Sequence, residues 1–263
     1  MYVEEQGPEG GVPIVFLHGS MVAGWMWTEQ VAALADDHRT IVPDLPGIGA
    51  SASDRWTGFA GAADSVAAEI TARAPDGAHV VGLSLGGIVA LNLAVTHPEC
   101  CRSLLVSGVP AGQLSAPLRM LNRAMASIYG TAFGSRLIGR IFGLPDQESM
   151  DAFVATARAT DRSAIRAIIA EVSSKPLPDR LDHISVPVLS VVGERDTEPA
   201  KRAVPLLMTS IPGSRGAHVP GVGHQWNAEA PALFAEMVRR WVDEQEIHPD
   251  LVPIDSGQSP GAG

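Results

Sequence analysis

The stretch AHVVGLSLGGIVALN, residues 78–92, decides the fold of this chain. An apolar run leads into the pentapeptide GLSLG (residues 82–86), and a second apolar run follows it, which predicts a buried strand, a very tight turn and a helix. Glycines flank Ser84 where the turn is crowded and side chains would clash. A serine at such a turn is lifted clear of the sheet, above the N-terminus of the helix. We therefore interpret Ser84 as a candidate nucleophile and the chain as an enzyme.

Short apolar stretches alternate with helical patterns along the rest of the chain. Strands are expected at residues 12–17, 39–43, 78–83, 103–109, 186–192 and 214–219, and helices at 25–35, 64–74, directly after Ser84 and at 228–244. Strands that alternate with helices in this way form a parallel sheet with helices on both faces. The pattern predicts an α/β fold with a doubly wound, mostly parallel sheet.

The pattern changes between residues 111 and 183, where helical periodicity continues without a clear strand. This segment contains nine Lys or Arg against seven Asp or Glu, whereas the rest of the chain is strongly acidic. We expect it to be an inserted helical cap, with some apolar side chains lining a pocket, on a core made by residues 1–110 and 184–247. Residues 248–263 are rich in Pro, Gly and Ser and are predicted to form a disordered tail.

Composition excludes several classes of function. The net charge of −10 disfavours nucleic acid and anionic membranes as partners, and no apolar run approaches the roughly 18 residues of a membrane span. The first six residues are acidic and lack an apolar signal region, which favours the cytoplasm. The only cysteines, Cys100 and Cys101, are adjacent and cannot build a disulfide framework. No motif typical of a metal site occurs, and no cofactor is expected.

A serine hydroxyl is a weak nucleophile at neutral pH and needs a base within hydrogen-bond reach. His224 is the candidate base because it ends the glycine-rich stretch GVGH, residues 221–224, between the last expected strand and the last helix. His218 is the nearest alternative, but it falls inside the expected strand and has no flexible flank. A histidine on a mobile loop can turn toward the serine, so His224 is preferred.

The base in turn needs a carboxylate that orients its ring. Asp196 is the candidate because it follows the strand at 186–192, at the carboxyl edge of the sheet. Glu194 is a nearby alternative that can instead pair with Arg195, and Asp182 precedes the strand and belongs to the wrong edge. Asp196 is therefore predicted to hold the imidazole of His224.

Backbone N–H groups must stabilise the negative oxygen that forms during acyl transfer. The N–H of Leu85, which follows the nucleophile, is one predicted donor. The second is the N–H of Ser20, in the loop after the strand at 12–17, with Met21 as the alternative. His18 is expected to anchor this loop, and Asp44 is expected to bind backbone groups in the turn DLPGIGAS, residues 44–51.

Taken together, these segments resemble the α/β-hydrolase fold superfamily, most closely its esterase, haloperoxidase-like and C–C hydrolase branch. The motifs that carry the resemblance are His18-Gly19, Trp27, DLPGIGAS at 44–51, GLSLGG at 82–87, GERD at 193–196 and Gly223-His224. They span about residues 12–243, and the chain order of serine, acid and histidine matches that of the superfamily. The resemblance implies the fold and a Ser84-Asp196-His224 triad, with the 111–183 insertion as a cap over the active site.

The leading hypothesis for function is hydrolysis of an ester or related acyl bond of a small, largely apolar substrate, through an acyl-enzyme on Ser84. Acyl transfer or cyclisation without water remains an alternative, as does C–C bond hydrolysis. A protein of this fold that senses a ligand with little turnover is the alternative from another class. The sequence sets neither the substrate nor the oligomeric state.

Overall fold

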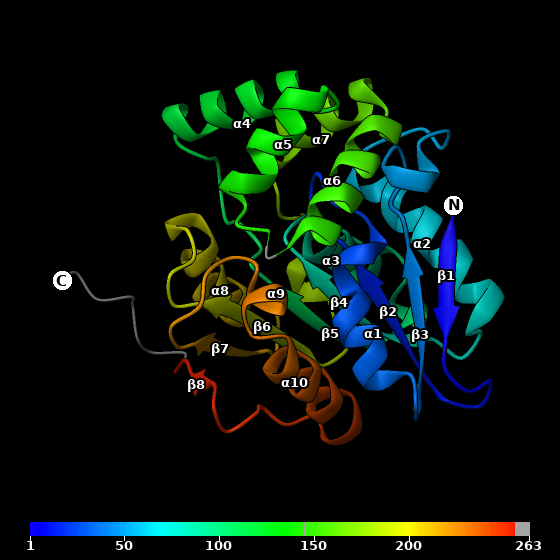
Figure 1. Cartoon of the computed structure of the whole chain (residues 1–263). Helices are drawn as coiled ribbons and strands as arrows, with labels where there is room; N and C mark the ends of the chain where they lie inside the picture. Colours follow the sequence, from blue (N-terminus) through cyan, green and yellow to red (C-terminus); the bar gives the residue numbers. More distant parts are fainter. Residues whose placement is uncertain (145, 256–263) are drawn as a thin grey trace.

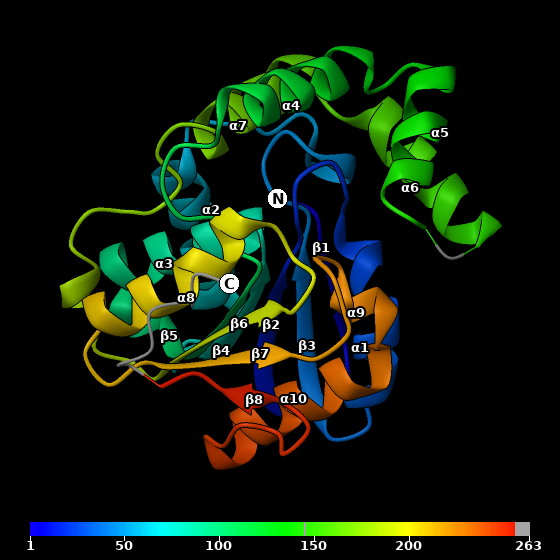
Figure 2. The same cartoon turned by 90° about the vertical axis from the view of Figure 1, so that its left-hand side faces the viewer.

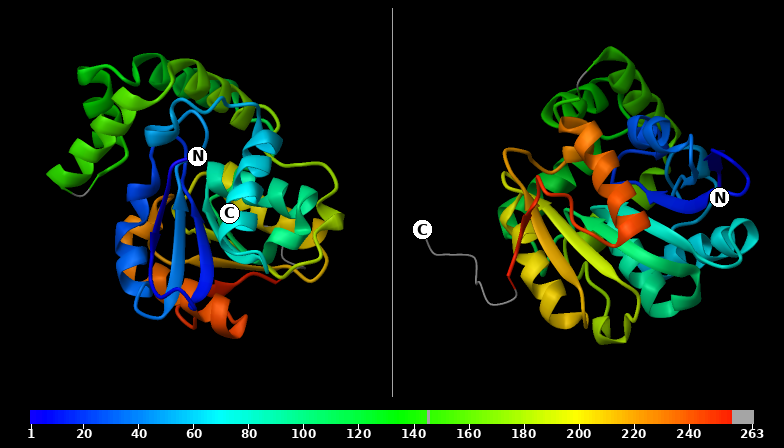
Figure 3. Two further views of the ribbon diagram at one scale, coloured as in Figure 1. Left: turned by 90° about the vertical axis from the view of Figure 1, so that its right-hand side faces the viewer. Right: turned by 90° about the horizontal axis from the view of Figure 1, so that it is seen from below.

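The computed structural model describes residues 1–144 and 146–255, and its centre is a single eight-stranded sheet (Figure 1). The strands are β1 (Val3–Gln6), β2 (Val12–Leu17), β3 (His38–Pro43), β4 (Ala78–Leu83), β5 (Cys101–Ser107), β6 (Val188–Gly193), β7 (Arg215–Val219) and β8 (Val252–Pro253). Their order across the sheet is β1-β3-β2-β4-β5-β6-β7-β8. The six strands from β2 to β7 are parallel, whereas β1 and β8 pair antiparallel at opposite edges (Figure 3).

Helices cover both faces of the sheet, as the alternating pattern predicts. The core helices are α1 (Thr28–Leu34), α2 (Phe59–Arg73), α3 (Leu85–Thr96), α8 (Glu198–Ser210), α9 (Trp226–Glu229) and α10 (Pro231–Glu244). Short 3-10 turns occupy Gly24–Trp27, Gly49–Ser51, Pro98–Cys100 and Leu181–His183. The α/β fold with a doubly wound, mostly parallel sheet is therefore confirmed.

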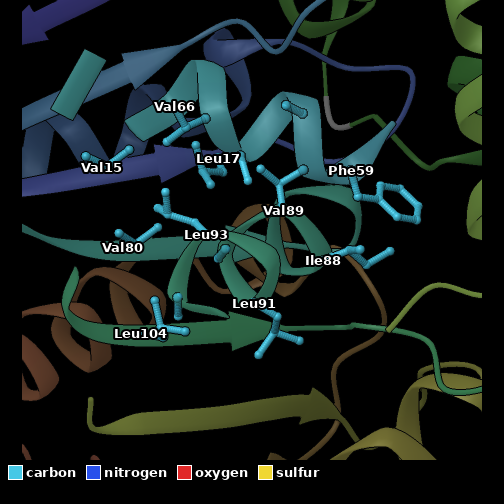
Figure 4. Packing of buried hydrophobic residues seen from close by; sticks show 14 of the residues in the cluster. Val15, Leu17, Phe59, Val66, Val80, Ile88, Val89, Leu91, Leu93 and Leu104 are labelled. Carbon is cyan, nitrogen blue, oxygen red and sulfur yellow. The ribbon is translucent and has the colours of Figure 1, made fainter. Parts of the chain in front are cut away.

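Side chains of the strands alternate between the two faces, and each set packs against different helices. On β2, Val15 and Leu17 pack with α2 and α3, while Ile14 and Phe16 pack with α1 and α10. Helix α3 lies between the sheet and α2, which fits its apolar residues on nearly every side. Figure 4 shows Val89 of α3 and Val66 of α2 in the same cluster. This buried helix fixes the position of the turn at its N-terminus.

Four helices occupy the inserted segment and lie above the carboxyl ends of the strands (Figure 1). They are α4 (Ala116–Ile128), α5 (Ala132–Ile141), α6 (Gln147–Ala159) and α7 (Arg162–Val172), and we call this group the cap. Figure 2 shows α4 beside α7 and α5 beside α6. The side chains of Thr131, Asp146 and Asp161 accept backbone N–H bonds at the starts of α5, α6 and α7.

Hydrogen bonds fasten the cap to the core at several places, and two of them come from tryptophans of the core. The indole N–H of Trp25 donates to Thr156 Oγ1 of α6 at 2.9 Å, and that of Trp56 donates to Glu171 Oε2 of α7 at 3.2 Å. Cap and core also share an apolar cluster in which Phe153 and Ile165 of the cap pack with Met21 of the core. The cap therefore rests directly on the loop that contains Ser20 and Met21.

The sequence analysis did not predict the two edge strands, β1 and β8. Strand β1 has the sequence VEEQ, whose polar residues give no apolar pattern, and β8 has only two residues. Three predicted helices also differ from the structure, and the one expected at 228–244 is interrupted at Ala230 between α9 and α10. The helix expected at 25–35 is a 3-10 turn followed by α1, and α2 begins at Phe59 rather than at residue 64.

The prediction of a disordered tail from residue 248 is wrong for residues 248–255. Leu251 is buried in the cluster beside α10, and Val252 pairs with His218 of β7. The N–H of Ile254 also donates to the carbonyl of Gly216 at 2.9 Å. Apolar residues between the prolines and the open edge of β7 explain this order. Residues 256–263 lie outside the described part of the chain. Among the described residues, no helix is long and apolar enough to cross a membrane.

Candidate active site

Ser84 lies at the sharp turn between β4 and α3. Its backbone has φ 55° and ψ −111°, and its N–H donates to the carbonyl of Ser107 at 2.7 Å. A non-glycine residue at positive φ is strained and persists where the surroundings enforce it, often at functional sites. A Cβ at Gly82 would overlap the carbonyl of Gly86, and one at Gly86 would overlap the carbonyl of Leu17. The glycines therefore permit the turn that the sequence predicts.

His224 and Asp196 come together although 28 residues separate them in the chain. The Nδ1 atom of His224 lies 2.9 Å from both carboxylate oxygens of Asp196. Asp196 is only 6% exposed, and its Oδ1 also accepts the N–H of Thr197 at 2.5 Å. Since an ionised carboxylate only accepts hydrogen bonds, Nδ1 is the protonated nitrogen and Nε2 is left as the basic one.

Ser84 and His224 line the same cavity, which has a volume of about 370 Å³. The core supplies Ser20, Met21 and Met26 to its walls. The cap supplies mostly apolar side chains, namely Leu118, Met125, Ile141, Phe142, Ile169 and Val172, together with the amide of Asn122. The structure thus brings the predicted nucleophile and the predicted base to one cavity beneath the cap. The loop with the predicted oxyanion donors, Ser20 and Met21, lines the same cavity, and we call it the oxyanion loop.

His18 holds the loop that contains Ser20 and Met21 from the core side. Its Nε2 accepts the N–H of Leu45 at 2.8 Å, so its Nδ1 carries the proton and donates to the carbonyl of Gly19 at 2.9 Å. Burial lowers the pKa of His18, which keeps the ring neutral and preserves this tautomer. The C=O and N–H of a trans peptide point in opposite directions, so the N–H of Ser20 points away from His18. His18 is therefore an anchor, as predicted.

Leu85 is the first residue of α3, where backbone N–H groups have no partner within the helix. Its N–H therefore belongs to the positive end of the helix dipole, directly beside Ser84. Ser20 belongs to the loop after β2 and lines the cavity together with Ser84. These placements fit the two predicted donors, and Met21 follows Ser20 in the same loop.

The residues predicted to be structural, and the alternatives to the triad, have other partners. Asp44 accepts the N–H of Gly24 and of Ala50, each at 2.8 Å, and so ties two loops together. Glu194 accepts the N–H of Gly221 at 2.7 Å and shapes the loop that holds His224. His218 lies within the β7–β8 pairing, and Asp182 lies in an exposed turn before β6.

Sequence reasoning missed Gly108, Trp226 and the cap residue Tyr129. Gly108 has φ 61°, and a Cβ there would lie 2.8 Å from His224 Cε1. The indole N–H of Trp226 donates to Ser107 Oγ at 2.7 Å, beside the strand end that supports Ser84. Gly108 directly follows an apolar strand and Trp226 follows His224 by two residues, so both positions could have been singled out from the sequence. Nothing in the sequence pointed to Tyr129, whose contact spans 108 residues.

Among residues 1–144 and 146–255, no group of three or more His, Cys, Asp or Glu side chains could hold a metal ion. Cys100 and Cys101 are buried thiols that do not line the cavity, and burial raises the pKa of both. They are therefore poor nucleophiles at neutral pH.

A parallel sheet with a serine at its strand-to-helix turn defines the class of α/β hydrolases. The sequence model of the alpha/beta hydrolase family matches residues 14–237, and the chain belongs to that family of enzymes. It is 28% identical over 254 residues to a pimeloyl-[acyl-carrier protein] methyl ester esterase of Aeromonas hydrophila, covering 90% of this chain and 96% of that protein. It is also 28% identical to an AB hydrolase superfamily protein of Gibberella zeae, covering 90% of this chain and 82% of that protein.

Solved structures agree with this assignment of the fold. A hydrolase from Pseudomonas aeruginosa has a TM-score of 0.76 at 25% identity, covering 92% of this chain and 93% of that one. The enol-lactonase from Burkholderia xenovorans has a TM-score of 0.75 at 20% identity, covering 92% of this chain and 96% of that one. The second similarity concerns the fold alone.

Proposed function

We propose that this protein is a serine esterase that uses Ser84, His224 and Asp196 as a catalytic triad. The observation that carries the proposal is the His224–Asp196 hydrogen bond of 2.9 Å at the wall of the cavity that Ser84 also lines. The strained backbone of Ser84 gives it independent support, because such strain is retained where function requires it. Curated relatives named as esterases support ester hydrolysis in general.

The reaction would proceed in two halves. The hydroxyl oxygen of Ser84 attacks the ester carbonyl carbon while His224 Nε2 takes the proton, and the carbonyl π electrons move onto oxygen. The N–H groups of Ser20 and Leu85 stabilise this negative oxygen. The intermediate collapses by breaking the bond to the alkoxy oxygen, which leaves as an alcohol with the proton from His224. Water then attacks the acyl-enzyme by the same steps and releases a carboxylic acid and free Ser84.

The cavity favours a neutral acyl group of modest size. Its walls are mostly apolar, and a volume of about 370 Å³ suits a small or medium-sized ligand. Among the described residues that line it, only His224 and Glu229 have ionisable side chains. Glu229 accepts the N–H of Gly223 at 3.0 Å and pairs with Arg195 at 3.2 Å. A free carboxylate in the acyl chain would lack a cationic partner there. We therefore propose small, largely apolar esters as substrates, including chains whose distal carboxyl group is itself a neutral ester.

The test compares wild type with Ser84→Ala on p-nitrophenyl esters of increasing acyl length. Loss of the nucleophile is expected to lower kcat by roughly 10⁴-fold or more. Ser65→Ala is the matched control, because its hydroxyl lies on α2 and donates to the carbonyl of Gly61. A fluorophosphonate probe should label Ser84 in wild type and in the control. Undiminished turnover in Ser84→Ala would refute the proposal.

The esters and the fluorophosphonate probe also distinguish esterase activity from the alternative functions. A ligand-sensing protein of this fold would bind the esters but would neither turn them over nor react with the probe. A C–C hydrolase would react with the probe and prefer diketones over esters. An acyl transferase would release more product when an acceptor alcohol or amine competes with water.

A further inference from the structure

Tyr129 is a cap residue whose hydroxyl group reaches into the core. It follows α4, and its side chain is 1% exposed. Its ring packs edge-on against Phe153 of α6, with centroids 5.8 Å apart and an interplanar angle of 79°. The hydroxyl donates to the carbonyl oxygen of Met21 at 2.8 Å. The cap thus holds the ring in place, and the ring delivers one hydrogen-bond donor to the oxyanion loop.

Met21 is an unusual residue for the place it occupies. Its φ is 66°, a backbone conformation that disfavours side chains, and its side chain is 1% exposed. Glycine would adopt this conformation without strain, so the loop depends on external contacts to keep its shape. The carbonyl of Met21 is the group by which Tyr129 supplies such a contact.

The oxyanion loop is therefore held at both ends. His18 fixes the carbonyl of Gly19, which belongs to the same peptide as the N–H of Ser20. Tyr129 fixes the carbonyl of Met21, one residue beyond Ser20. The core provides the first contact and the cap provides the second. Without the second, rotation of the peptides around Met21 is free to relieve the strain at φ 66° and to turn the N–H of Ser20 away from the cavity.

We propose that Tyr129 is a positioning residue, which holds the oxyanion loop in its productive shape and so makes oxyanion stabilisation depend on a seated cap. This inference rests on the proposed function. Tyr129 does not line the cavity, so its effect on the reaction passes through the backbone of Met21 and Ser20. An N–H group that moves away from the oxyanion stabilises the transition state less and therefore lowers kcat. It does not weaken binding of the neutral substrate.

The test is Tyr129→Phe, which removes the hydroxyl group and keeps the ring that packs on Phe153. Loss of one buried hydrogen bond that shapes the loop should lower kcat by about tenfold and leave KM within about twofold. Inactivation by a fluorophosphonate should slow by a similar factor, since it also develops charge on oxygen. The pH profile of kcat/KM should keep its shape, because the base His224 is untouched.

Thr156→Val is the matched control. It removes the hydroxyl that accepts the Trp25 N–H, so it also breaks one cap–core hydrogen bond, but it touches neither the loop nor the cavity. Its kcat should stay within about twofold of wild type. Circular dichroism and melting curves on both variants check that each is folded at the assay temperature.

Three results would overturn the inference: a kcat for Tyr129→Phe within about twofold of wild type, an effect confined to KM, or an equal loss of kcat in Thr156→Val. These results are distinct from failure of the proposed function. If Ser84→Ala is inactive and Tyr129→Phe is normal, the triad stands and only the role of Tyr129 falls. If Ser84→Ala retains activity, the proposed function itself falls.

Discussion

Gly108 lies beside the His224–Asp196 pair, so the substitution Gly108→Ala probes that pair without changing any of its chemical groups. A Cβ at this position would lie 2.8 Å from His224 Cε1, 3.0 Å from Nδ1 and 3.3 Å from Asp196 Oδ2. Carbon atoms in contact normally stay at least about 3.5 Å apart. The imidazole ring must therefore move by about 0.7 Å or more to accommodate the methyl group.

A shift of this size has a predictable kinetic cost. A misplacement of about 1 Å in an active site can lower the rate by roughly 10²-fold, which corresponds to about 2.7 kcal/mol of barrier. We expect kcat/KM of Gly108→Ala for p-nitrophenyl esters to fall by about 50- to 100-fold. The φ of 61° adds strain of about 1 kcal/mol for alanine, which should lower the melting temperature by a few degrees.

Gly112→Ala separates the effect of backbone strain from the effect of displacing the imidazole ring. Gly112 has a similar φ of 69°, but a Cβ there would meet no atom within 4 Å. This variant should show a comparable loss of melting temperature with kcat/KM close to wild type. A Gly108→Ala variant that keeps more than half of its activity, or a Gly112→Ala variant that loses as much activity, would rule out a damaging clash with His224.

Two further predictions concern the orienting acid and a buried histidine. Asp196→Asn places an amide where His224 needs an acceptor, so kcat should fall by roughly 10³- to 10⁴-fold in steady-state assays. Glu194→Gln should stay within about fivefold, and the reverse ranking would reassign the acid. His79 is buried, its Nδ1 lies 2.8 Å from Ser103 Oγ, and burial lowers its pKa from 6.5 to about 4. The unfolded chain therefore binds more protons between these values, and the free energy of unfolding should fall as pH drops from 6.5 to 4. In urea titrations His79→Gln should reduce this slope by up to about 1.4 kcal/mol per pH unit, and an unchanged slope would contradict the assignment.

The parts of the fold that the sequence predicted are those with strong local signals. The buried strand β4 and the apolar helix α3 meet at a glycine-rich turn, and the order of apolar runs and glycines predicts this strand, turn and helix. Most of the parallel strands, such as β2, β4 and β6, are short and mainly apolar because helices cover both faces of a parallel sheet. The edge strands β1 and β8 lack such a signal because pairing, rather than side-chain burial, defines them.

The residues of the candidate site also fall into those that the sequence predicted and those that it did not. Ser84, Asp196 and His224 were predicted because each follows a strand at the carboxyl edge, where a parallel sheet gathers its loops. The cap residues that line the cavity were beyond prediction, since an amphipathic helix gives no sign of which partner its apolar side will meet. The same limit applies to Tyr129, whose importance lies in one hydrogen bond to a distant backbone carbonyl.

We propose that Ser84, His224 and Asp196 act as one unit with the N–H groups of Ser20 and Leu85. A crystal structure of the protein after reaction with a phosphonate ester tests it most directly, since the adduct mimics the tetrahedral intermediate. We expect phosphorus bonded to Ser84 Oγ, one phosphonyl oxygen within about 3 Å of both N–H groups, and His224 Nε2 facing the leaving-group side. An adduct on another residue, or a phosphonyl oxygen that neither N–H group contacts, would rule out this arrangement of the active site.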